Sequence, residues 1–127
     1  MSWSSYIDNM KAQGVQEGGI FSHEGDEWAT SANFKPSKDE VKKIVGYIKS
    51  QKFDEINLAG SKYMFINSDS GTLTCKCTKA ASDDKKYLVY CSLGKSFIMI
   101  GATAGAGERG QSVVVDKLKE YLSGVGY

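Results

Sequence analysis

Hydrophobic residues at the beginning of the chain recur with the period of an α-helix. In the first ten residues, Trp3, Tyr6, Ile7 and Met10 are spaced i, i+3, i+4 and i+7, and Ser2 before them is a suitable N-cap. Two interpretations of this stripe are open. Either all four side chains are buried, or Trp3 and Tyr6, which carry hydrogen-bond donors, form part of a binding surface.

A second helical pattern follows Pro36, the only proline. Ser37 and Glu40 are three residues apart and match a capping box. We therefore expect a helix from about Lys38 to Gln51. Its apolar stripe consists of Val41, Ile44, Val45 and Ile48.

A third helix is predicted near the end of the chain, from about Gly110 to Ser123. Gly124 follows it, where a C-terminal cap glycine is common. The apolar stripe of this helix consists of Val114, Leu118, Tyr121, Leu122 and Val125.

The remaining apolar residues lie in short or alternating runs that predict strands. The glycine pair at 18–19 interrupts the pattern before the first of them. The predicted strands are 20–22, 27–31, 63–67, 72–79, 86–92 and 96–102. The connections at 23–26, 69–71, 82–85 and 94–95 are too short for parallel crossovers, which need about a dozen residues or more. The sequence therefore predicts an α+β fold with an antiparallel meander and helices on its faces.

Length and charge restrict the class of protein. The 127 residues are expected to form one domain, 1–127, with a substantial core. A net charge of +1 gives no field that favours nucleic acid, and we expect no nucleic-acid partner. No apolar run approaches the roughly 18 residues of a membrane span, and no secretory signal is visible. Three cysteines, an odd number, fit a reducing compartment better than a disulfide framework.

Candidate catalytic or metal-binding chemistry is weak. Residues 105–110 match G-x-G-x-x-G, but that fingerprint needs a parallel unit and an acidic residue about 20 positions later, whereas only the seventeen residues 111–127 follow. Cys75 and Cys77 share a sheet face without a zinc-like partner pair, so they and Cys91 are expected to be buried. His23 lies in a polar turn without an obvious nucleophile. We expect no enzyme activity, no cofactor and no metal.

The aromatic residues are more informative. If the two terminal helices pack side by side on the sheet, five rings converge: Trp3, Tyr6, Trp28, Tyr121 and Tyr127. Such a cluster suits a polyproline II ligand, whose proline rings stack on flat faces and whose carbonyl groups accept hydrogen bonds. The pattern alone leaves this site and ordinary core packing equally open.

Several motifs resemble the profilin family. The first is Ser2-Trp3-x-x-Tyr6-Ile7-Asp8 at the start, and the others, in order, are Trp28-Ala29, the run at 58–63, the strand at 95–101 and the ending at 117–122. The resemblance covers essentially the whole chain. It implies a central antiparallel sheet of about six or seven strands, with the N- and C-terminal helices packed together on one face and further helices on the other.

The resemblance also implies a function. Profilins bind monomeric actin and proline-rich proteins such as formins, and often phosphoinositide lipids at the membrane surface. The chain is thus expected to be a monomeric cytoplasmic protein of the cytoskeleton that delivers actin to filament-assembly factors and regulates actin polymerisation. The alternative is a polyproline- or phosphoinositide-binding module with weak or no actin binding.

The resemblance assigns residues to these partners. The five aromatics named above match the family's proline-binding residues, with Tyr121 standing where some profilins carry histidine. The actin surface corresponds to Lys62, Phe65, Asn67, Lys76 or Lys79, Gly107, Arg109, Ser112, Val113 and Lys117. Asn67 and Val113 replace common basic residues, and Lys117 replaces a frequent acidic one. Phosphoinositide binding needs a basic patch, which Lys62, Lys76, Lys79, Lys85 and Lys86 could supply. A solvated lysine face is an equal alternative for these residues.

Overall fold

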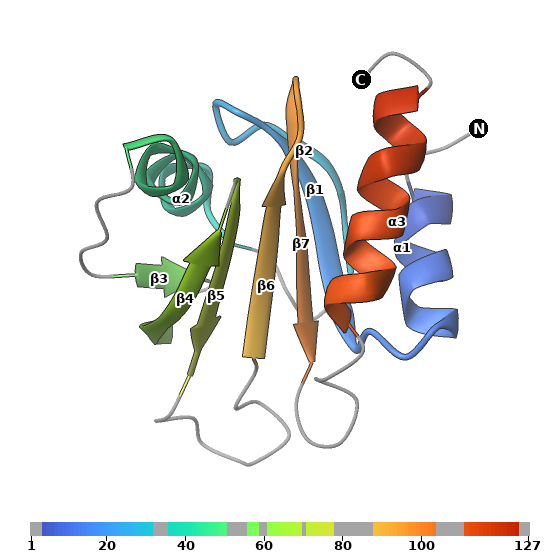
Figure 1. Cartoon of the computed structure of the whole chain (residues 1–127), viewed down its shortest axis with the longest axis horizontal. Coiled ribbons are helices and arrows are strands. Elements are labelled where there is room, and N and C mark those ends of the chain that lie inside the picture. The colour runs from blue at the N-terminus through green and yellow to red at the C-terminus, as the bar shows by residue number, and fades with distance from the viewer. Residues whose placement is uncertain are drawn as a thin grey trace.

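The computed structural model of the protein describes residues 4–31, 36–50, 56–58, 61–69, 71–77, 88–103 and 111–124, with the backbone alone at 4, 58, 61, 69, 111 and 112. These residues form three helices and seven strands (Figure 1). Their order is α1 (Ser4–Ala12), β1 (Glu17–Ser22), β2 (Glu27–Thr30), α2 (Lys38–Ser50), β3 (Ile56–Leu58), β4 (Ser61–Asp69), β5 (Thr72–Lys76), β6 (Leu88–Leu93), β7 (Phe97–Thr103) and α3 (Gln111–Gly124). None of the three helices is long and apolar enough to cross a membrane.

The seven strands form one antiparallel sheet in the order β2-β1-β7-β6-β5-β4-β3. The antiparallel prediction is confirmed, and β3 to β7 follow one another as a meander. The meander does not extend to the first hairpin, because β1 pairs with β7, with Ile20 opposite Met99. Local turn lengths give no information on a pairing between strands so distant in the sequence.

Strand β1 begins at Glu17, so the glycine pair predicted to interrupt the pattern lies within it. Gly18 allows a close approach between layers. A Cβ atom there would lie 2.5 Å from Cε of Met10 and 3.3 Å from the carbonyl oxygen of Ile100. The absence of a side chain therefore lets α1 and β7 pack tightly on β1.

The third strand, β3, was not predicted, because its three residues are too short for a periodic signal. It pairs with the start of β4, which is longer than predicted and contains a register irregularity between Phe65 and Asn67. After β4, Gly71 adopts φ of 83°, a left-handed conformation that suits the predicted tight turn. Of the predicted strands 72–79 and 86–92, residues 78–79 and 86–87 lie outside the described residues.

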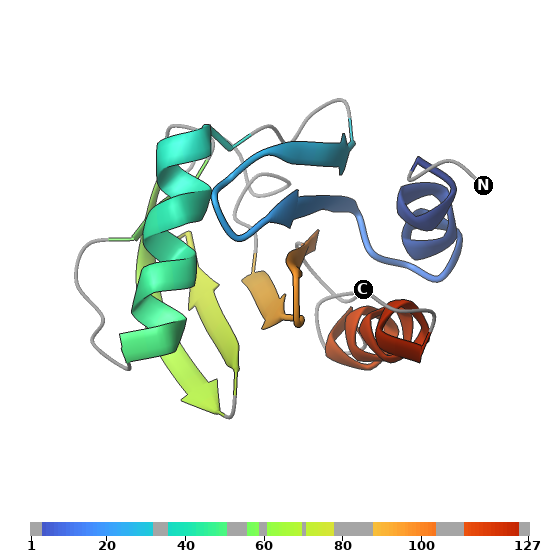
Figure 2. The same ribbon diagram turned by 90° about the horizontal axis from the view of Figure 1, so that it is seen from above.

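Each face of the sheet carries its own hydrophobic core. In β7, Ile98 and Ile100 point to the α2 side, whereas Phe97 and Met99 point to the side of α1 and α3. Figure 2 shows α2 on one face and the α1–α3 pair on the other, as the resemblance implied for the terminal helices. The predicted apolar stripe of α2 is buried in the core between α2 and the sheet.

The three cysteines are also buried in the core under α2, as predicted, and all three are free thiols. Burial raises the pKa of the Cys75 thiol to about 12 and that of Cys91 well above its usual value. Both groups are therefore protonated at neutral pH, and a nucleophilic thiolate is not available there.

The capping box at the start of α2 is confirmed. The backbone N–H of Ser37 donates to Oε1 of Glu40 at 2.8 Å, and the backbone N–H of Glu40 donates to Oγ of Ser37 at 3.2 Å. These reciprocal bonds satisfy two backbone donors that have no partner within the helix. They explain why α2 begins at Lys38, as the sequence predicted.

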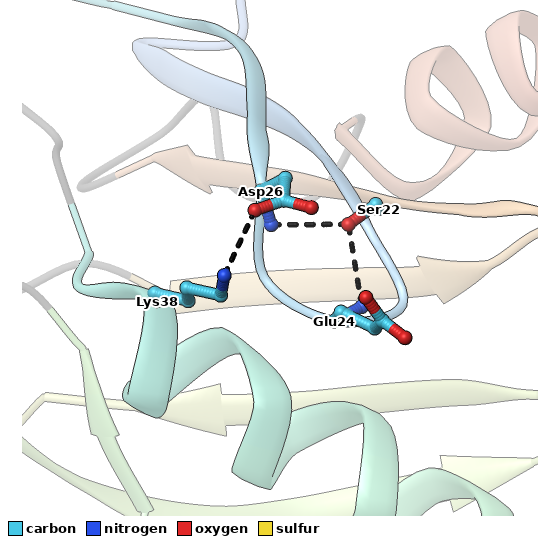
Figure 3. A network of polar contacts seen from close by, with 4 residues as sticks. All are labelled: Ser22, Glu24, Asp26 and Lys38. Atoms are coloured by element: carbon cyan, nitrogen blue, oxygen red, sulfur yellow. Dashed lines mark hydrogen bonds and ion pairs between the residues drawn. The ribbon is translucent and has the colours of Figure 1, made fainter.

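The β1–β2 turn is attached to two neighbouring elements. Oγ of Ser22 accepts hydrogen bonds from the backbone N–H groups of Glu24 and Asp26, and the Asp26 carboxylate pairs with Lys38 of α2 at 3.0 Å (Figure 3). On the other side, Nε2 of His23 lies 2.8 Å from the carbonyl oxygen of Gly94. The histidine therefore has a structural partner in the β6–β7 turn.

The terminal helices are held on the sheet by a few large apolar side chains. Ile7 and Met10 of α1 are buried. In α3, Val114, Val115 and Leu122 are buried, and Leu118 packs partly against the same core. The prediction placed Tyr121 in the apolar stripe, but 48% of it is exposed. Gly124 is the last residue of α3 rather than a cap beyond it, and Val125 lies outside the described residues.

Candidate functional site: an aromatic groove and an open sheet face

A groove of about 380 Å³ lies between α1 and α3, which run side by side over the sheet (Figures 1 and 2). The volume is within the range of ordinary ligand sites. Helix α1 contributes Ser5, Tyr6 and Asn9, the turn after it contributes Gln13, and α3 contributes Lys117, Leu118 and Tyr121. The groove therefore combines aromatic rings with hydroxyl and amide groups.

Two of the predicted aromatic residues meet in this groove. The ring centroids of Tyr6 and Tyr121 are 6.0 Å apart, and the ring planes are tilted by 45°. This is a favourable arrangement for aromatic pairs. Tyr6 is half-buried and Tyr121 is exposed. The pair thus presents ring surface from both ends of the chain at one position.

Trp28 lies close by but has a different environment. Its ring centroid is 6.1 Å from that of Phe97, and it packs against the core beneath the terminal helices. It is half-buried and is not one of the groove-lining residues. Trp3 and Tyr127 lie outside the described residues, so the convergence of all five aromatics stays a prediction.

The end of α1 shapes one end of the groove. The N–H of Val15 donates to the carbonyl of Met10 at 2.9 Å, and that of Gly14 donates to the carbonyl of Lys11 at 3.1 Å. With Gly14 at φ of 99°, these bonds form a Schellman motif. Gln13, just before this glycine, donates its side-chain amide to Oδ1 of Asn9 along the polar edge of the groove.

A second candidate surface lies on the same side of the sheet, over β4 and β5. Leu73 and Cys75 of β5 face the core under α2, so the alternate residues, including Lys76, face the opposite side. The pairings of Lys76 with Met64 and of Thr74 with Asn67 bring β4 residues to that side. We call this surface, made of Lys62, Met64, Asn67, Thr72, Thr74 and Lys76, the open sheet face.

The open sheet face contains part of the predicted actin-binding set. Lys62 and Asn67 are exposed and Lys76 is half-buried. Met64 is 52% exposed, which is unusual for a large apolar side chain in a sheet. Phe65 is also exposed, but the register places it opposite Cys75 rather than opposite Lys76. Lys79, Gly107 and Arg109 lie outside the described residues, as do Lys85 and Lys86 of the predicted phosphoinositide site.

Helix α3 is attached to the sheet beside the open sheet face by a polar network. The hydroxyl of Tyr90 lies 3.1 Å from both carboxylate oxygens of Asp116, and Oγ of Ser92 donates to Oδ1 at 3.3 Å. Burial, followed by the negative charge of Asp116, raises the pKa of Tyr90 to about 12. The phenol therefore remains a hydrogen-bond donor at neutral pH and fixes α3 against β6.

The remaining predicted actin residues lie on α3. Val113 is 56% exposed, and Lys117 is exposed one turn further along the same helix. Lys117 lines the groove with Tyr121. The side chain of Ser112 lies outside the described residues. Among the described residues, the predicted set is thus divided between the open sheet face and α3, with Phe65 on the opposite side of β4.

Some site residues were missed in the sequence. Ser5, Asn9 and Gln13 repeat at i, i+4 and i+8, but a polar helical stripe usually faces solvent. Only the position of α3 turns that stripe into the side of a groove. No sequence pattern pointed to Asp116, because its hydrogen-bond partners Tyr90 and Ser92 lie in β6, far away in the sequence. Among the described residues, no cluster of three or more histidine, cysteine or acidic side chains could hold a metal ion.

This arrangement, with two terminal helices forming an aromatic groove on a seven-stranded antiparallel sheet, is that of a profilin-like binding protein. The profilin family model matches residues 1–127. The chain is 30% identical to the profilin of Bombyx mori over 133 residues, with full coverage of both proteins. It is similar to the structure of Acanthamoeba castellanii profilin IA with a TM-score of 0.82 and 24% identity, covering 99% of this chain and 100% of that one. The chain therefore belongs to the profilin family, whose members are actin-binding proteins without enzymatic activity.

Two other structures share the fold and contain a partner. One is mouse profilin IIa in complex with a double repeat from the FH1 domain of mDia1, with 20% identity, a TM-score of 0.79 and full coverage of both chains. The other is a complex of LokiProfilin2 with rabbit actin, with 14% identity, a TM-score of 0.71 and coverage of 96% and 97%. At these identities the two comparisons show the fold alone.

Proposed function

We propose that this protein binds monomeric actin and proline-rich segments at separate surfaces. It delivers actin to filament-assembly factors such as formins and so regulates actin polymerisation. Family membership supports this proposal, and the observation that carries it is the contact between Tyr6 and Tyr121 in the groove. The protein works as a single-domain monomer in the cytoplasm, within the cytoskeleton.

The groove between α1 and α3 is the proposed site for the proline-rich segment. A polyproline II helix has no internal hydrogen bonds, so its carbonyl groups are free to accept bonds from hydroxyl and amide donors. Tyrosine hydroxyls and the amides of Asn9 and Gln13 provide such donors beside the ring surface. The proposed residues are Trp3, Tyr6, Trp28, Tyr121 and Tyr127.

The open sheet face and the adjoining part of α3 are the proposed actin surface. The exposed apolar side chains Met64 and Val113 lie there. Methionine is enriched at protein interfaces, and polar side chains are common at their rims. By family analogy, binding blocks addition at the slow-growing filament end and alters nucleotide exchange on actin. The proposed residues there are Lys62, Asn67, Lys76, Lys79, Gly107, Arg109, Ser112, Val113 and Lys117, the last of which also borders the groove. Phe65 is proposed as well, although its pairing with Cys75 places it outside the open sheet face.

Phosphoinositides are a further proposed partner. Lys62 and Lys76 lie on the open sheet face, so an anionic lipid headgroup bound there competes with actin. The expected result is a loss of actin binding when phosphoinositide vesicles are added. If vesicles and actin bind at the same time, the two sites are different.

Two titrations test the two binding sites separately. Intrinsic fluorescence is followed while a decaproline peptide is added, and pyrene-actin assembly is followed at excess protein. We expect Tyr121→Ala to weaken decaproline binding at least about tenfold, because aromatic contacts supply much of the binding free energy, and to leave the assembly delay in place. Lys62→Gln is the reciprocal variant and is expected to shorten the delay without changing the decaproline titration.

The outcomes distinguish the candidate functions. A wild-type protein whose fluorescence does not respond to decaproline contradicts the proline-binding proposal. A wild-type protein that binds decaproline but causes no assembly delay is instead a polyproline- or phosphoinositide-binding module.

A further inference from the structure

The groove between α1 and α3 contains one feature that proline recognition does not require. Among the described residues that line it, Lys117 is the only one that is charged at neutral pH. Of the described residues in α1 and the turn after it, Ser5, Tyr6, Asn9 and Gln13 line the groove, and none of them is charged. A proline-rich segment offers ring surface and carbonyl oxygens, for which an uncharged lining is sufficient.

Among the described residues, the ammonium group of Lys117 has no polar partner. No hydrogen bond or ion pair of this side chain is formed with any other described residue. The nearest acidic residues along α3 are Asp116, which accepts hydrogen bonds from Tyr90 and Ser92, and Glu120, which is exposed one turn further on. The charge of Lys117 is therefore available to a ligand in the groove.

We propose that the groove selects proline-rich segments that carry a carboxylate next to the proline run, and that Lys117 is the residue that recognises it. This inference rests on the proposed function of the groove. The charge complementarity makes an acidic side chain the matching ligand group.

The spacing along α3 defines where that carboxylate belongs. Lys117 and Tyr121 are four residues apart, which is about 6 Å along a helix at 1.5 Å per residue. A polyproline II ligand rises about 3.1 Å per residue, so this distance corresponds to about two ligand residues. An acidic residue directly beside the proline run therefore reaches Lys117 while the prolines lie on the Tyr6–Tyr121 pair.

The test uses octaproline peptides with capped ends, so that only the added residue carries charge. One peptide has glutamate after the last proline, another has glutamate before the first, and glutamine replaces glutamate in the two reference peptides. Only the glutamate at the peptide end that lies beside Lys117 can contact it. We therefore expect one of the two glutamate peptides to bind about two- to fivefold more tightly than its glutamine reference, an affinity gain in the range of a partly exposed ion pair. The gain should disappear in about 1 M salt, where charges are screened beyond about 3 Å.

Variants assign the preference to one residue. In Lys117→Gln the glutamate-to-glutamine affinity ratio should fall to about one, and in Lys117→Glu a lysine-bearing peptide should become the preferred ligand. Lys11→Gln removes the same charge from an exposed position of α1 that does not line the groove, and it should keep the wild-type ratio.

Three results would overturn the inference. They are equal affinities for the glutamate and glutamine peptides, a preference that survives in Lys117→Gln, or the same gain for a glutamate placed ten residues away through a glycine-serine linker. If the glutamine references bind and glutamate gives no advantage, only this inference fails. If no octaproline peptide binds at all, the proposed function of the groove fails with it.

Discussion

The groove between α1 and α3 depends on contacts between distant parts of the chain, whereas the open sheet face depends on strand register. Tyr6 and Tyr121 come from opposite ends of the sequence and meet only because each helix is anchored on the sheet. On the open sheet face, Met64 and Lys76 are brought together by one antiparallel pairing of neighbouring strands. Because the two surfaces rest on different contacts, damage to one need not spread to the other.

The largest expected effect comes from removing an anchor of α1. Met10 is buried between α1 and β1, so Met10→Ala leaves a cavity and should lower the free energy of unfolding by about 2–5 kcal/mol. Lys11→Ala changes the next, exposed residue and should stay within about 0.5 kcal/mol of the wild type. Urea denaturation measures both variants.

The same variant separates the two surfaces. Since α1 lines the groove and not the open sheet face, warming Met10→Ala should abolish decaproline binding at a lower temperature than actin binding. Simultaneous loss of both activities would mean that the groove and the sheet unfold together.

An intermediate effect is expected where α3 meets the sheet beside the open face. Tyr90→Phe removes the hydroxyl that donates to Asp116, and should lower the free energy of unfolding by about 1 kcal/mol at neutral pH. The carboxylate is only half-buried and can accept a bond from water instead, which limits the loss. Ser92→Ala removes a longer contact to the same carboxylate and should cost less; a larger cost for Ser92→Ala would contradict this ranking.

The pH dependence of Tyr90→Phe gives a second measurement. The pKa of Tyr90 is raised from 10.0 to about 12 in the folded protein, so its contribution to stability is complete below pH 10 and is lost as the pH rises from 10 to about 12. The wild type should therefore lose more stability than Tyr90→Phe over that interval. Cys75 has a raised pKa in both proteins, so comparing the two removes its contribution. Parallel pH profiles would show that Tyr90 is not responsible.

The smallest expected effect lies on the opposite face, away from both surfaces. Gly46 is an exposed residue in the middle of α2, and a Cβ atom there meets nothing within 4 Å. Gly46→Ala should raise the free energy of unfolding by about 0.5–1 kcal/mol, because alanine favours the helix. Decaproline and actin titrations should be unchanged. A change in either one would indicate that α2 is coupled to the binding surfaces.

Residues with short-range patterns were predicted well. The start of α2 followed from Ser37 and Glu40, which form the capping box. The burial of Cys75 and Cys77 followed from alternation along the predicted strand 72–79. These features depend on residues within one or two turns or one strand of each other. Interactions over such short separations can be recognised from the spacing of residues in the sequence.

Other features could not be predicted from local patterns. Tyr121 lies three residues after the partly buried Leu118 and directly before the buried Leu122. The pattern assigns all three to one stripe, although Tyr121 lies at its exposed margin beside Tyr6. The position of Lys117 in the groove depends on where α1 lies. The sequence contains no signal for the distance between two helices.

The sequence by itself determined the antiparallel sheet and the extents of α2 and α3 to within a residue or two. It also showed aromatic residues at helical spacing near both chain ends. These features could be predicted because periodicity and turn chemistry act over short distances. Tertiary structure decided that β1 pairs with β7, that α1 and α3 share one face and that Tyr6 and Tyr121 meet. These outcomes depend on the burial of apolar surface between distant segments. Burial is non-directional, and only complementary packing in the whole fold selects one arrangement.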